Sequence, residues 1–315
     1  MLYHRFASVL LLLVCSTLMA QAQAPRAAQD FYNRGHRRYT KGDLDGAIAD
    51  FTQAIELSSR LDGGHHRPGK TTSEFSGGAS HFDRIAVIDP LAAAAYTDRA
   101  LARCDQGDLE GAINDCNRAI AINPRLKEAY LNRGIARFRQ KDLAGALADF
   151  DRTLAINPRD AEAYNNRGNV RMARGDLAGA LADFDQAIAL NPRRAEIYCN
   201  RGHVRRDQRE VEGALADFER AIELNPRLAE AFHGRGLVRA DKRDWERAIT
   251  DFSRALELDP RFAWAYWDRG LVRLHQGQQA EAEADFAQCL RLDPSLGPKL
   301  EQSIQVVKQW RANQR

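Results

Sequence analysis

Three residues with metal-ligand chemistry lie on one face of an expected helix in the second half of the chain. Cys199, His203 and Asp207 are spaced four residues apart, and His233 follows Cys199 by 34 residues. Thiolate, imidazole and carboxylate groups are the usual ligands of zinc. Asp207, however, lies about 12 Å from Cys199 along a helix axis, which is too far for both to bind one ion. These side chains therefore fit a polar binding surface, and no metal site is predicted.

A second candidate is the phosphate-binding pattern GxxxxGK[ST], which residues 64–71 match as GHHRPGKT. A phosphate loop works because a buried strand before it and a helix after it direct backbone N–H groups at the phosphates. Here serine and glycine residues flank the pattern, and no parallel sheet is expected. His65, His66 and His81 have no fixed geometry that would hold a metal. The sequence therefore predicts no nucleotide, metal or other cofactor.

The overall composition excludes further classes. The formal net charge is +3 among 315 residues, and no dense run of Lys and Arg suggests nucleic-acid binding. No nucleophile and base are expected to meet in a closed pocket, so we predict that the protein is not an enzyme. The charged fraction of 28% suits long amphipathic helices with one solvated face.

Residues 1–24 have the pattern of a cleavable signal peptide. His4 and Arg5 precede an apolar run over residues 6–19, and small residues alternate up to Ala24. We expect cleavage after Ala22 or Ala24, and hence a periplasmic or secreted mature chain without a membrane span. An uncleaved anchor is a weaker alternative because the run is shorter than a span requires. A lipid-modified Cys15 is weaker still.

Export would place the remaining cysteines in an oxidising compartment. Cys104 and Cys116 fall in one repeat on two different helices, so their pairing stays open, although buried free thiols are the preferred interpretation. Cys289 stands where other repeats have a small packing residue.

The rest of the chain is built on a period of 34 residues. Residues 161–192 illustrate the repeat, with one helix expected at about 161–174, a second at about 177–190, and Gly175-Asp176 as the turn between them. Repeats of this length bury their apolar faces on their neighbours and form a solenoid. Prolines at an exact interval of 34 mark the repeat ends: Pro90, Pro124, Pro158, Pro192, Pro226, Pro260 and Pro294.

The positions of Tyr164, Gly168, Ala180, Phe184 and Ala187, closed by a terminal proline, resemble the pattern of the tetratricopeptide repeat family. The resemblance covers most of the mature chain. It implies an all-α fold, a right-handed superhelical solenoid of antiparallel helix pairs that binds other proteins.

The expected organisation has five parts. After the signal peptide, the first repeat occupies residues 25–59. Residues 60–92 form a Gly/Ser-rich loop insertion with a degenerate repeat, since residues 81–90 align with 149–158. Six contiguous repeats follow over residues 93–294. Residues 295–315 are predicted to form a capping helix, because Leu300, Ile304, Val307 and Trp310 make one apolar stripe.

Three charges recur in every repeat and predict a ladder of ion pairs between the two helices. Two arginines spaced four residues apart repel one another, so a nearby carboxylate should offset them. The aspartates of this ladder precede the packing residue of each second helix: Asp50, Asp115, Asp149, Asp183, Asp217, Asp251 and Asp285. A basic binding stripe is the less favoured interpretation.

By resemblance to the family, the first helices line a concave groove with the second, fifth, ninth, twelfth and thirteenth residues of each repeat. These residues vary here, which predicts a peptide-binding groove with two apolar ends and a polar middle. The predicted groove residues are Leu131, Ile135, Phe138, Asn165, Asn169, Met172, Cys199, His203, Arg206, His233, Leu237, Trp264, Trp267, Leu271 and Leu274.

Some family members bind a C-terminal carboxylate through Lys and Asn in the groove, but Tyr32 and His36 occupy those places here, so that ligand is not carried over. The sequence favours a scaffold that binds a protein or peptide in the groove. The alternative is a structural or assembly component of the cell envelope that acts through its convex face or by self-association. Packing of Leu131, Ile135 and Phe138 against neighbouring helices is a competing interpretation of the first apolar end.

Overall fold

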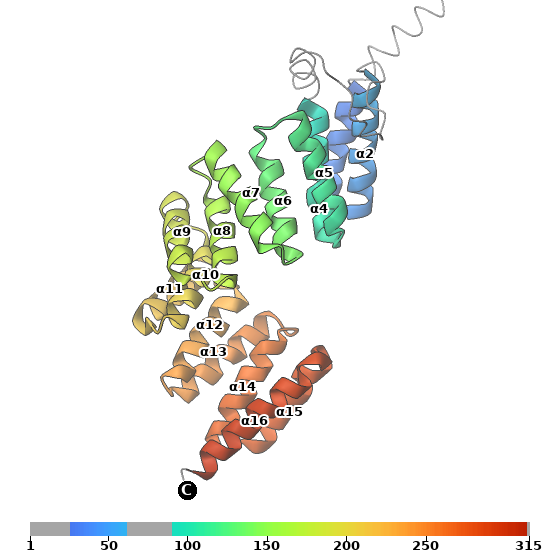
Figure 1. The fold of residues 1–315 in the computed structure, drawn as a ribbon. Helices are drawn as coiled ribbons and strands as arrows, with labels where there is room; N and C mark the ends of the chain where they lie inside the picture. Colours follow the sequence, from blue (N-terminus) through green and yellow to red (C-terminus); the bar gives the residue numbers. More distant parts are fainter. Residues whose placement is uncertain (1–25, 62–89, 314–315) are drawn as a thin grey trace, which may run out of the picture. The chain divides into compact units, whose positions relative to one another are not determined.

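The computed structural model describes residues 26–61 and 90–313. The predicted signal peptide, the GHHRPGKT pattern and all of the predicted degenerate repeat except Pro90 lie outside these residues. All the regular elements of the described part are helical (Figure 1). Among these helices, no helix is both long and apolar enough to cross a membrane. The predicted all-α fold of antiparallel helix pairs is confirmed.

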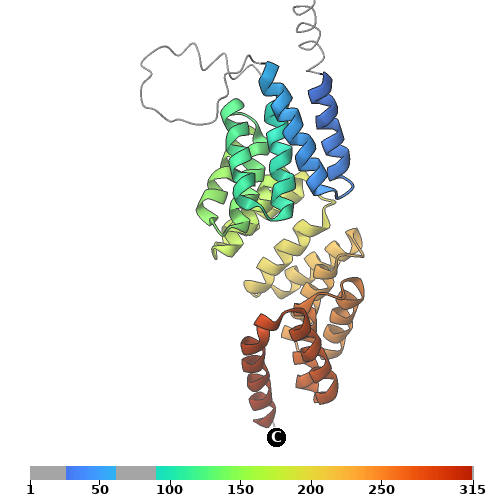
Figure 2. The same cartoon turned by 90° about the vertical axis from the view of Figure 1, so that its right-hand side faces the viewer.

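The chain divides into two compact units, Met1–Pro158 and Arg159–Arg315. In the N-terminal unit, the second helix of the first repeat packs on the first helix of the second repeat, although residues 62–89 separate them in the sequence, and the second helix of the second repeat packs on the first helix of the third (Figure 2). Its helices are a first helix over residues 26–39, α2 (Leu44–Leu61), α4 (Pro90–Gln106), α5 (Leu109–Ile122), α6 (Lys127–Arg139) and α7 (Leu143–Ile156).

The C-terminal unit continues the same order of packing and ends in an additional helix. The helices expected at 161–174 and 177–190 are α8 and α9, so both predictions are confirmed to within one residue. The helices are α8 (Ala161–Ala173), α9 (Leu177–Leu190), α10 (Ala195–Asp207), α11 (Val211–Leu224), α12 (Ala229–Asp241), α13 (Trp245–Leu258), α14 (Ala263–Gln276), α15 (Gln279–Leu292), the 3-10 turn η1 (Pro294–Leu296) and α16 (Gly297–Ala312).

A glycine opposite a phenylalanine sets the close approach of the two helices in most repeats. Phe184 is fully buried, and a Cβ added to Gly168 would lie 2.7 Å from its Cε1 atom. The same pair recurs in every described repeat except the second. There Ala100 replaces the glycine and the smaller Cys116 replaces the phenylalanine, and both are buried in one cluster. The two changes compensate in volume, so the helix pair is retained.

The turn between paired helices requires a left-handed residue. Gly175 has φ +80°, and the next residue, Asp176, caps α9 by accepting a hydrogen bond from the backbone N–H of Gly179. Glycine adopts this conformation at little cost. Three repeats instead place a long basic residue there, with positive φ at Lys141, Arg209 and Arg243. These three turns therefore store backbone strain that glycine would relieve.

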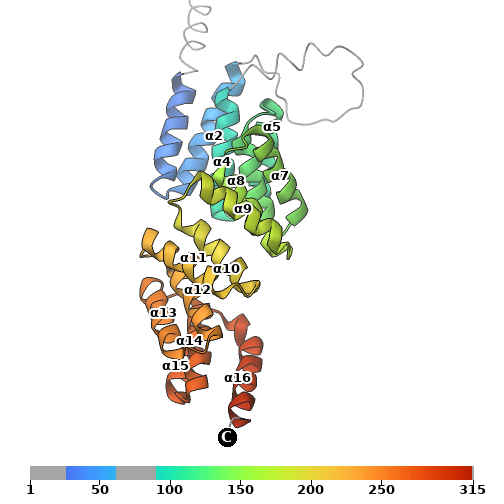
Figure 3. The same cartoon turned by 90° about the vertical axis from the view of Figure 1, so that its left-hand side faces the viewer.

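The C-terminal helix α16 departs from the repeat geometry. Within the C-terminal unit, α10, α12 and α14 each pack on the second helix of the preceding repeat as well as on their own partner, whereas α16 packs on α14, the first helix of the seventh repeat (Figure 3). Leu300 and Val307 of the predicted apolar stripe are buried there, and Ile304 packs beside them. The helix therefore covers the last repeat from the side of its first helix.

Candidate functional site

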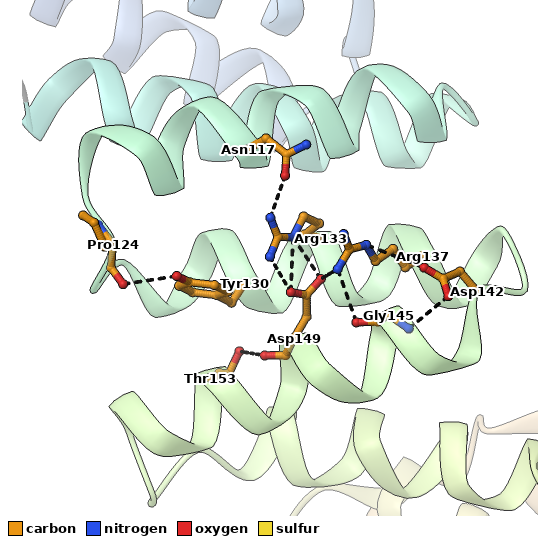
Figure 4. Close-up of polar contacts among 9 residues, drawn as sticks. All are labelled: Asn117, Pro124, Tyr130, Arg133, Arg137, Asp142, Gly145, Asp149 and Thr153. Atoms are coloured by element: carbon orange, nitrogen blue, oxygen red, sulfur yellow. Dashed lines mark hydrogen bonds and ion pairs between the residues drawn. The ribbon is translucent and has the colours of Figure 1, made fainter. Parts of the chain in front are cut away.

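The recurring charges form a closed network inside each repeat, and the third repeat shows its design (Figure 4). Asp149 extends from α7 toward α6, and its side chain is only 3% exposed. Arg133 donates to this carboxylate from Nη2 at 2.6 Å and from Nε at 3.0 Å. Arg137, one turn later, donates from Nη1 to Oδ2 at 2.7 Å. Asp149 is thus fully engaged by two guanidinium groups.

The network also joins neighbouring repeats. Arg133 reaches back to the second helix of the preceding repeat, where its Nη1 donates to Asn117 Oδ1 at 2.6 Å. In the same way Arg201 donates to Asp185 at 2.6 Å. The ladder predicted from the sequence is confirmed in all seven repeats, at Asp50, Asp115, Asp149, Asp183, Asp217, Asp251 and Asp285. Because the arginines are held by the chain itself, they serve the scaffold.

From the second repeat onward, the fifth residue of each repeat is buried. Asn200 Nδ2 donates to Asn165 Oδ1 at 3.0 Å, and His233 Nε2 lies 2.7 Å from Asp268 Oδ2. These contacts link α8 to α10 and α12 to α14. Five predicted groove residues are therefore buried, and two of them, Asn165 and His233, contact the following repeat: the five are Leu131, Asn165, Cys199, His233 and Trp267.

The ninth and twelfth residues are the more accessible groove positions. Most of the predicted ones are partly buried, including Ile135 and Phe138 on α6 in the N-terminal unit, whereas Leu274, the twelfth residue of the seventh repeat, is buried. Ile135 also packs against the core cluster of the second repeat, as the competing interpretation expects for one residue of that apolar end. In the C-terminal unit the partly buried residues are Asn169, Met172, His203, Arg206, Leu237 and Leu271.

Sequence reasoning missed a polar cluster in the first two repeats. His36 Nε2 lies 2.9 Å from the Asp98 carboxylate, and Tyr39 donates to Asp105 at 2.6 Å. Burial raises the pKa of Asp98 above its ordinary value, and burial together with the Asp105 hydrogen bond raises the pKa of Tyr39 to about 12. These contacts join the first helix to α4, so the cluster links the first repeat to the second.

The C-terminal unit holds a hollow of about 240 Å³, lined by residues of its fifth to seventh repeats. It contains three of the predicted residues, which the structure brings together. Sequence reasoning missed the other lining residues. Some of them stand at the twelfth or thirteenth position of a repeat, which are predicted groove positions, but they were not named as groove residues in these repeats. Its lining residues are Arg206, Leu237, Ala240, Asp241, Trp245, Phe252, Asp268, Leu271, Val272 and His275.

A close approach of α12 to the preceding repeat has a visible cause in the sequence. Gly234 stands where most other repeats have Asn or Asp. A Cβ at Gly234 would overlap the ring of Phe218 on α11 of the preceding repeat, so only glycine lets α12 lie this close to α11. The hollow itself is lined mainly by residues of α12, α13 and α14.

Each charged group that lines the hollow has a partner. Arg206 Nε donates to Asp241 Oδ2 at 2.7 Å, which bridges α10 and α12. Asp268 is held by His233. Trp245 stacks on His275 with ring centroids 5.1 Å apart and nearly parallel planes. Burial, followed by the charges of Arg311 and Arg243, lowers the pKa of His275.

The two tryptophans of the seventh repeat have different surroundings. Trp264 is 45% exposed, whereas Trp267 is 7% exposed and belongs to a cluster with Leu274 of α14 and Leu300 of α16. At the other end of α16, Trp310 meets the His275 ring edge-on at 4.9 Å and lies under the guanidinium of Arg243 at 5.7 Å. The C-terminal helix therefore covers Trp267 and leaves Trp264 accessible.

Of the cysteine and histidine residues that suggested metal chemistry, Cys199 and His233 are buried and His203 is partly buried. Burial raises the pKa of Cys199 to about 12 and lowers that of His203 to about 4. His203 packs edge-on against the Phe218 ring at 5.0 Å. Residues 26–61 and 90–313 contain no group of three potential metal ligands. Cys104, Cys116, Cys199 and Cys289 are free thiols, all buried.

Comparisons with known proteins agree with this architecture. Family models described as Tetratricopeptide repeat match residues 133–198, 195–228 and 233–296, and one described as TPR repeat matches 100–141. No curated protein matches the chain in sequence.

Many solved structures have a similar fold. A tetratricopeptide repeat protein from Parabacteroides merdae is 18% identical with a TM-score of 0.65, covering 89% of this chain and 99% of that one. PilF of Pseudomonas aeruginosa is 19% identical with a TM-score of 0.59, covering 68% and 96%. The Cut9–Hcn1 hetero-tetramer of APC/C is 15% identical with a TM-score of 0.62, covering 82% and 52%. These likenesses concern the fold.

Proposed function

The chain belongs to the tetratricopeptide repeat family, and we propose that it is a non-catalytic scaffold that binds a protein or peptide in the groove of its C-terminal unit. The observation that carries this proposal is the hollow between α12 and α14. It combines aliphatic side chains with a few charged groups, which is the usual composition of a site that anchors a peptide.

The contrast with the ladder supports the groove as the binding surface. The seven aspartates of the ladder are buried and paired inside the repeats, so they offer nothing to a ligand. Asp241 has a side chain that is 50% exposed, and Arg206 and Asp268 beside it are also reached by solvent. Polar groups that are partly exposed around an apolar centre are typical of recognition sites.

The chemistry of the buried thiols supports a non-catalytic role. A cysteine acts as a nucleophile through its thiolate. Burial raises the pKa of Cys116 and of Cys199 to about 12, so both thiols stay protonated at neutral pH. In this proposal neither thiol serves as a nucleophile.

The proposal places the mature protein in the periplasm or outside the cell, because residues 1–24 have the composition of a signal peptide. N-terminal sequencing of the protein from fractionated cells tests this. We expect a mature chain that begins at Gln23 or Pro25. An intact N-terminus in the cytoplasmic fraction would contradict the localisation without affecting the groove.

Site-specific cross-linking tests the binding surface. A photoreactive residue replaces Leu237 in the hollow, and a matched variant carries it at Gln186, an exposed position on the second helix α9. We expect cross-links to a partner protein from Leu237 and few from Gln186. Cross-links confined to Gln186, or joining two copies of this chain, would instead support the convex face or self-association and contradict the groove.

A further inference from the structure

The charged residues that line the hollow of the C-terminal unit are mainly acidic. Two carboxylates line it, Asp241 on α12 and Asp268 on α14, whereas Arg206 is the only guanidinium among its lining residues. His275 also lines it. Because burial and nearby arginines lower its pKa, His275 is neutral at pH 7 and adds no positive charge. The lining therefore carries an excess of negative charge.

Arg206, the one guanidinium among the lining residues, is already paired with a carboxylate. Arg206 binds Asp241 through Nε at 2.7 Å and through Nη2 at 3.4 Å. An acidic ligand would have to displace this carboxylate to reach the guanidinium, and it would then stand beside Asp241 and Asp268. Like charges placed side by side in a partly desolvated site oppose binding.

The carboxylates, by contrast, keep acceptor capacity. An ionised carboxylate has about four lone-pair sites. Asp268 accepts a hydrogen bond from His233, and its side chain is 21% exposed. Asp241 receives the two bonds from Arg206 and is half exposed. Both can therefore accept further hydrogen bonds from a ligand.

Between these carboxylates lies an aliphatic surface. Leu237 and Leu271 stand at the ninth positions of adjacent repeats, and Ala240 and Val272 complete the apolar lining. Lysine and arginine place a flexible hydrocarbon stem along apolar surface while the charged end reaches a polar group. The hollow offers both surfaces to such a side chain.

From this arrangement we infer that the hollow is a subsite for one lysine or arginine side chain of the bound partner, with its stem on Leu237 and Leu271 and its cation between Asp241 and Asp268. This inference rests on the proposed function and specifies the ligand of the same groove. The occupant is a basic segment of another protein.

Selection of peptides from a library tests the inference. Random 12-residue peptides displayed on phage are selected on the mature chain, and the enriched peptides are synthesised for binding measurements by fluorescence anisotropy. We expect a lysine or arginine next to an aliphatic or aromatic residue in the enriched sequences. Enrichment of acidic peptides that lose affinity when Arg206→Gln is introduced would overturn the inference.

Charge-neutral variants then locate the basic residue. For an enriched peptide, Asp268→Asn and Asp241→Asn should each weaken binding about tenfold, as expected for a charge-assisted hydrogen bond. A peptide with glutamine in place of its basic residue should bind weakly to the wild type and lose little more with either variant. Glu219→Gln, which removes the same charge from the exposed face of α11, should leave affinity unchanged.

Variants of the aliphatic surface distinguish the proposed groove function from the proposed basic subsite. Leu237→Ser should weaken binding, and Val306→Ser, which removes an exposed apolar side chain from α16, should not. If Leu237→Ser weakens binding while both aspartate variants bind as the wild type does, the groove function stands and the basic subsite is wrong. If the library yields no binding peptide, or none of the variants changes affinity, both are wrong. Circular dichroism and melting of each variant show that it is folded.

Discussion

The first helices carry two sets of polar residues that behave in opposite ways. Toward the second helix they present the arginines of the ladder, which are the same in every repeat and are held by a buried aspartate. Toward the groove they present residues that differ from repeat to repeat, such as Asn169, His203 and Leu237. Comparing repeats within one chain therefore separates the residues that hold the solenoid together from those available to a partner.

The contrast is clearest between Asp217 and Asp241. Both are aspartates that pair with arginine, but Asp217 has a side chain 4% exposed and accepts from Arg201 and Arg205. Asp241 is 50% exposed and accepts from Arg206 alone. One closes the interior of a repeat, and the other lies at the edge of the hollow.

The largest loss of stability is expected when a buried carboxylate of the ladder is removed. Asp217→Ala should lower the free energy of unfolding by about 3–5 kcal/mol, because it leaves two guanidinium groups without their buried partner. Asp241→Ala should cost less than about 1 kcal/mol, since its ion pair is exposed to solvent. Urea denaturation followed by circular dichroism measures both. Similar losses for the two variants would contradict the division between scaffold and groove.

The second prediction concerns a groove position that also serves the core. Burial lowers the pKa of His203 from 6.5 to about 4, so between these values the unfolded chain binds a proton that the folded chain does not. Stability should therefore fall as the pH falls from 6.5 toward 4, by at most about 3 kcal/mol from this residue. Denaturation midpoints measured from pH 8 to pH 4 provide the test.

His203→Gln is the control for this pH dependence. Other groups titrate in the same range, so the expected result is a smaller loss of stability in the variant than in the wild type. Parallel pH profiles for the two proteins would show that His203 is solvated in the folded state.

The third prediction tests the packing that brings the paired helices together. Gly168→Ala should destabilise the protein by about 1–2 kcal/mol, because overlap with the Phe184 ring outweighs the better helix propensity of alanine. Thermal melting by circular dichroism measures the loss. An unchanged or higher Tm would mean that the helix pair is not packed against this glycine.

A double-mutant cycle in the second repeat tests the same packing in the opposite direction. Cys116→Phe should be destabilising beside Ala100, and the double variant Ala100→Gly with Cys116→Phe should recover most of that loss. Additive effects in the double variant would contradict the compensation between these two positions.

The smallest change in stability is expected from substitutions that relieve or introduce backbone strain in the turns. Lys141 has φ +67°, where repeats with the unstrained turn have glycine. Lys141→Gly should stabilise the N-terminal unit by about 1 kcal/mol, and Gly175→Lys should destabilise the C-terminal unit by a similar amount. Urea midpoints of the two variants test the sign. A destabilising Lys141→Gly would show that the lysine side chain has an unrecognised role.

Much of the fold was predictable because its signals are local and repeated. The 34-residue spacing set α8 and α9 to within one residue, and the recurring charges predicted the ladder with its partners. The hollow depends on contacts between repeats that a single repeat does not encode. Gly234 lets α12 lie close to Phe218 of α11, and Asp268 contacts His233 only because α12 and α14 stack. The sequence pattern of α16 indicated a cap but not its placement on α14.

Hydrogen–deuterium exchange of the chain with and without a binding peptide tests the central claim that the varied face of the first helices is the binding surface. We predict that the peptide slows exchange in α12 and α14 around Leu237 and Leu271, and leaves α11 and the exposed face of α13 unchanged. Protection confined to α11 and α13, with none in α12 and α14, would contradict the account.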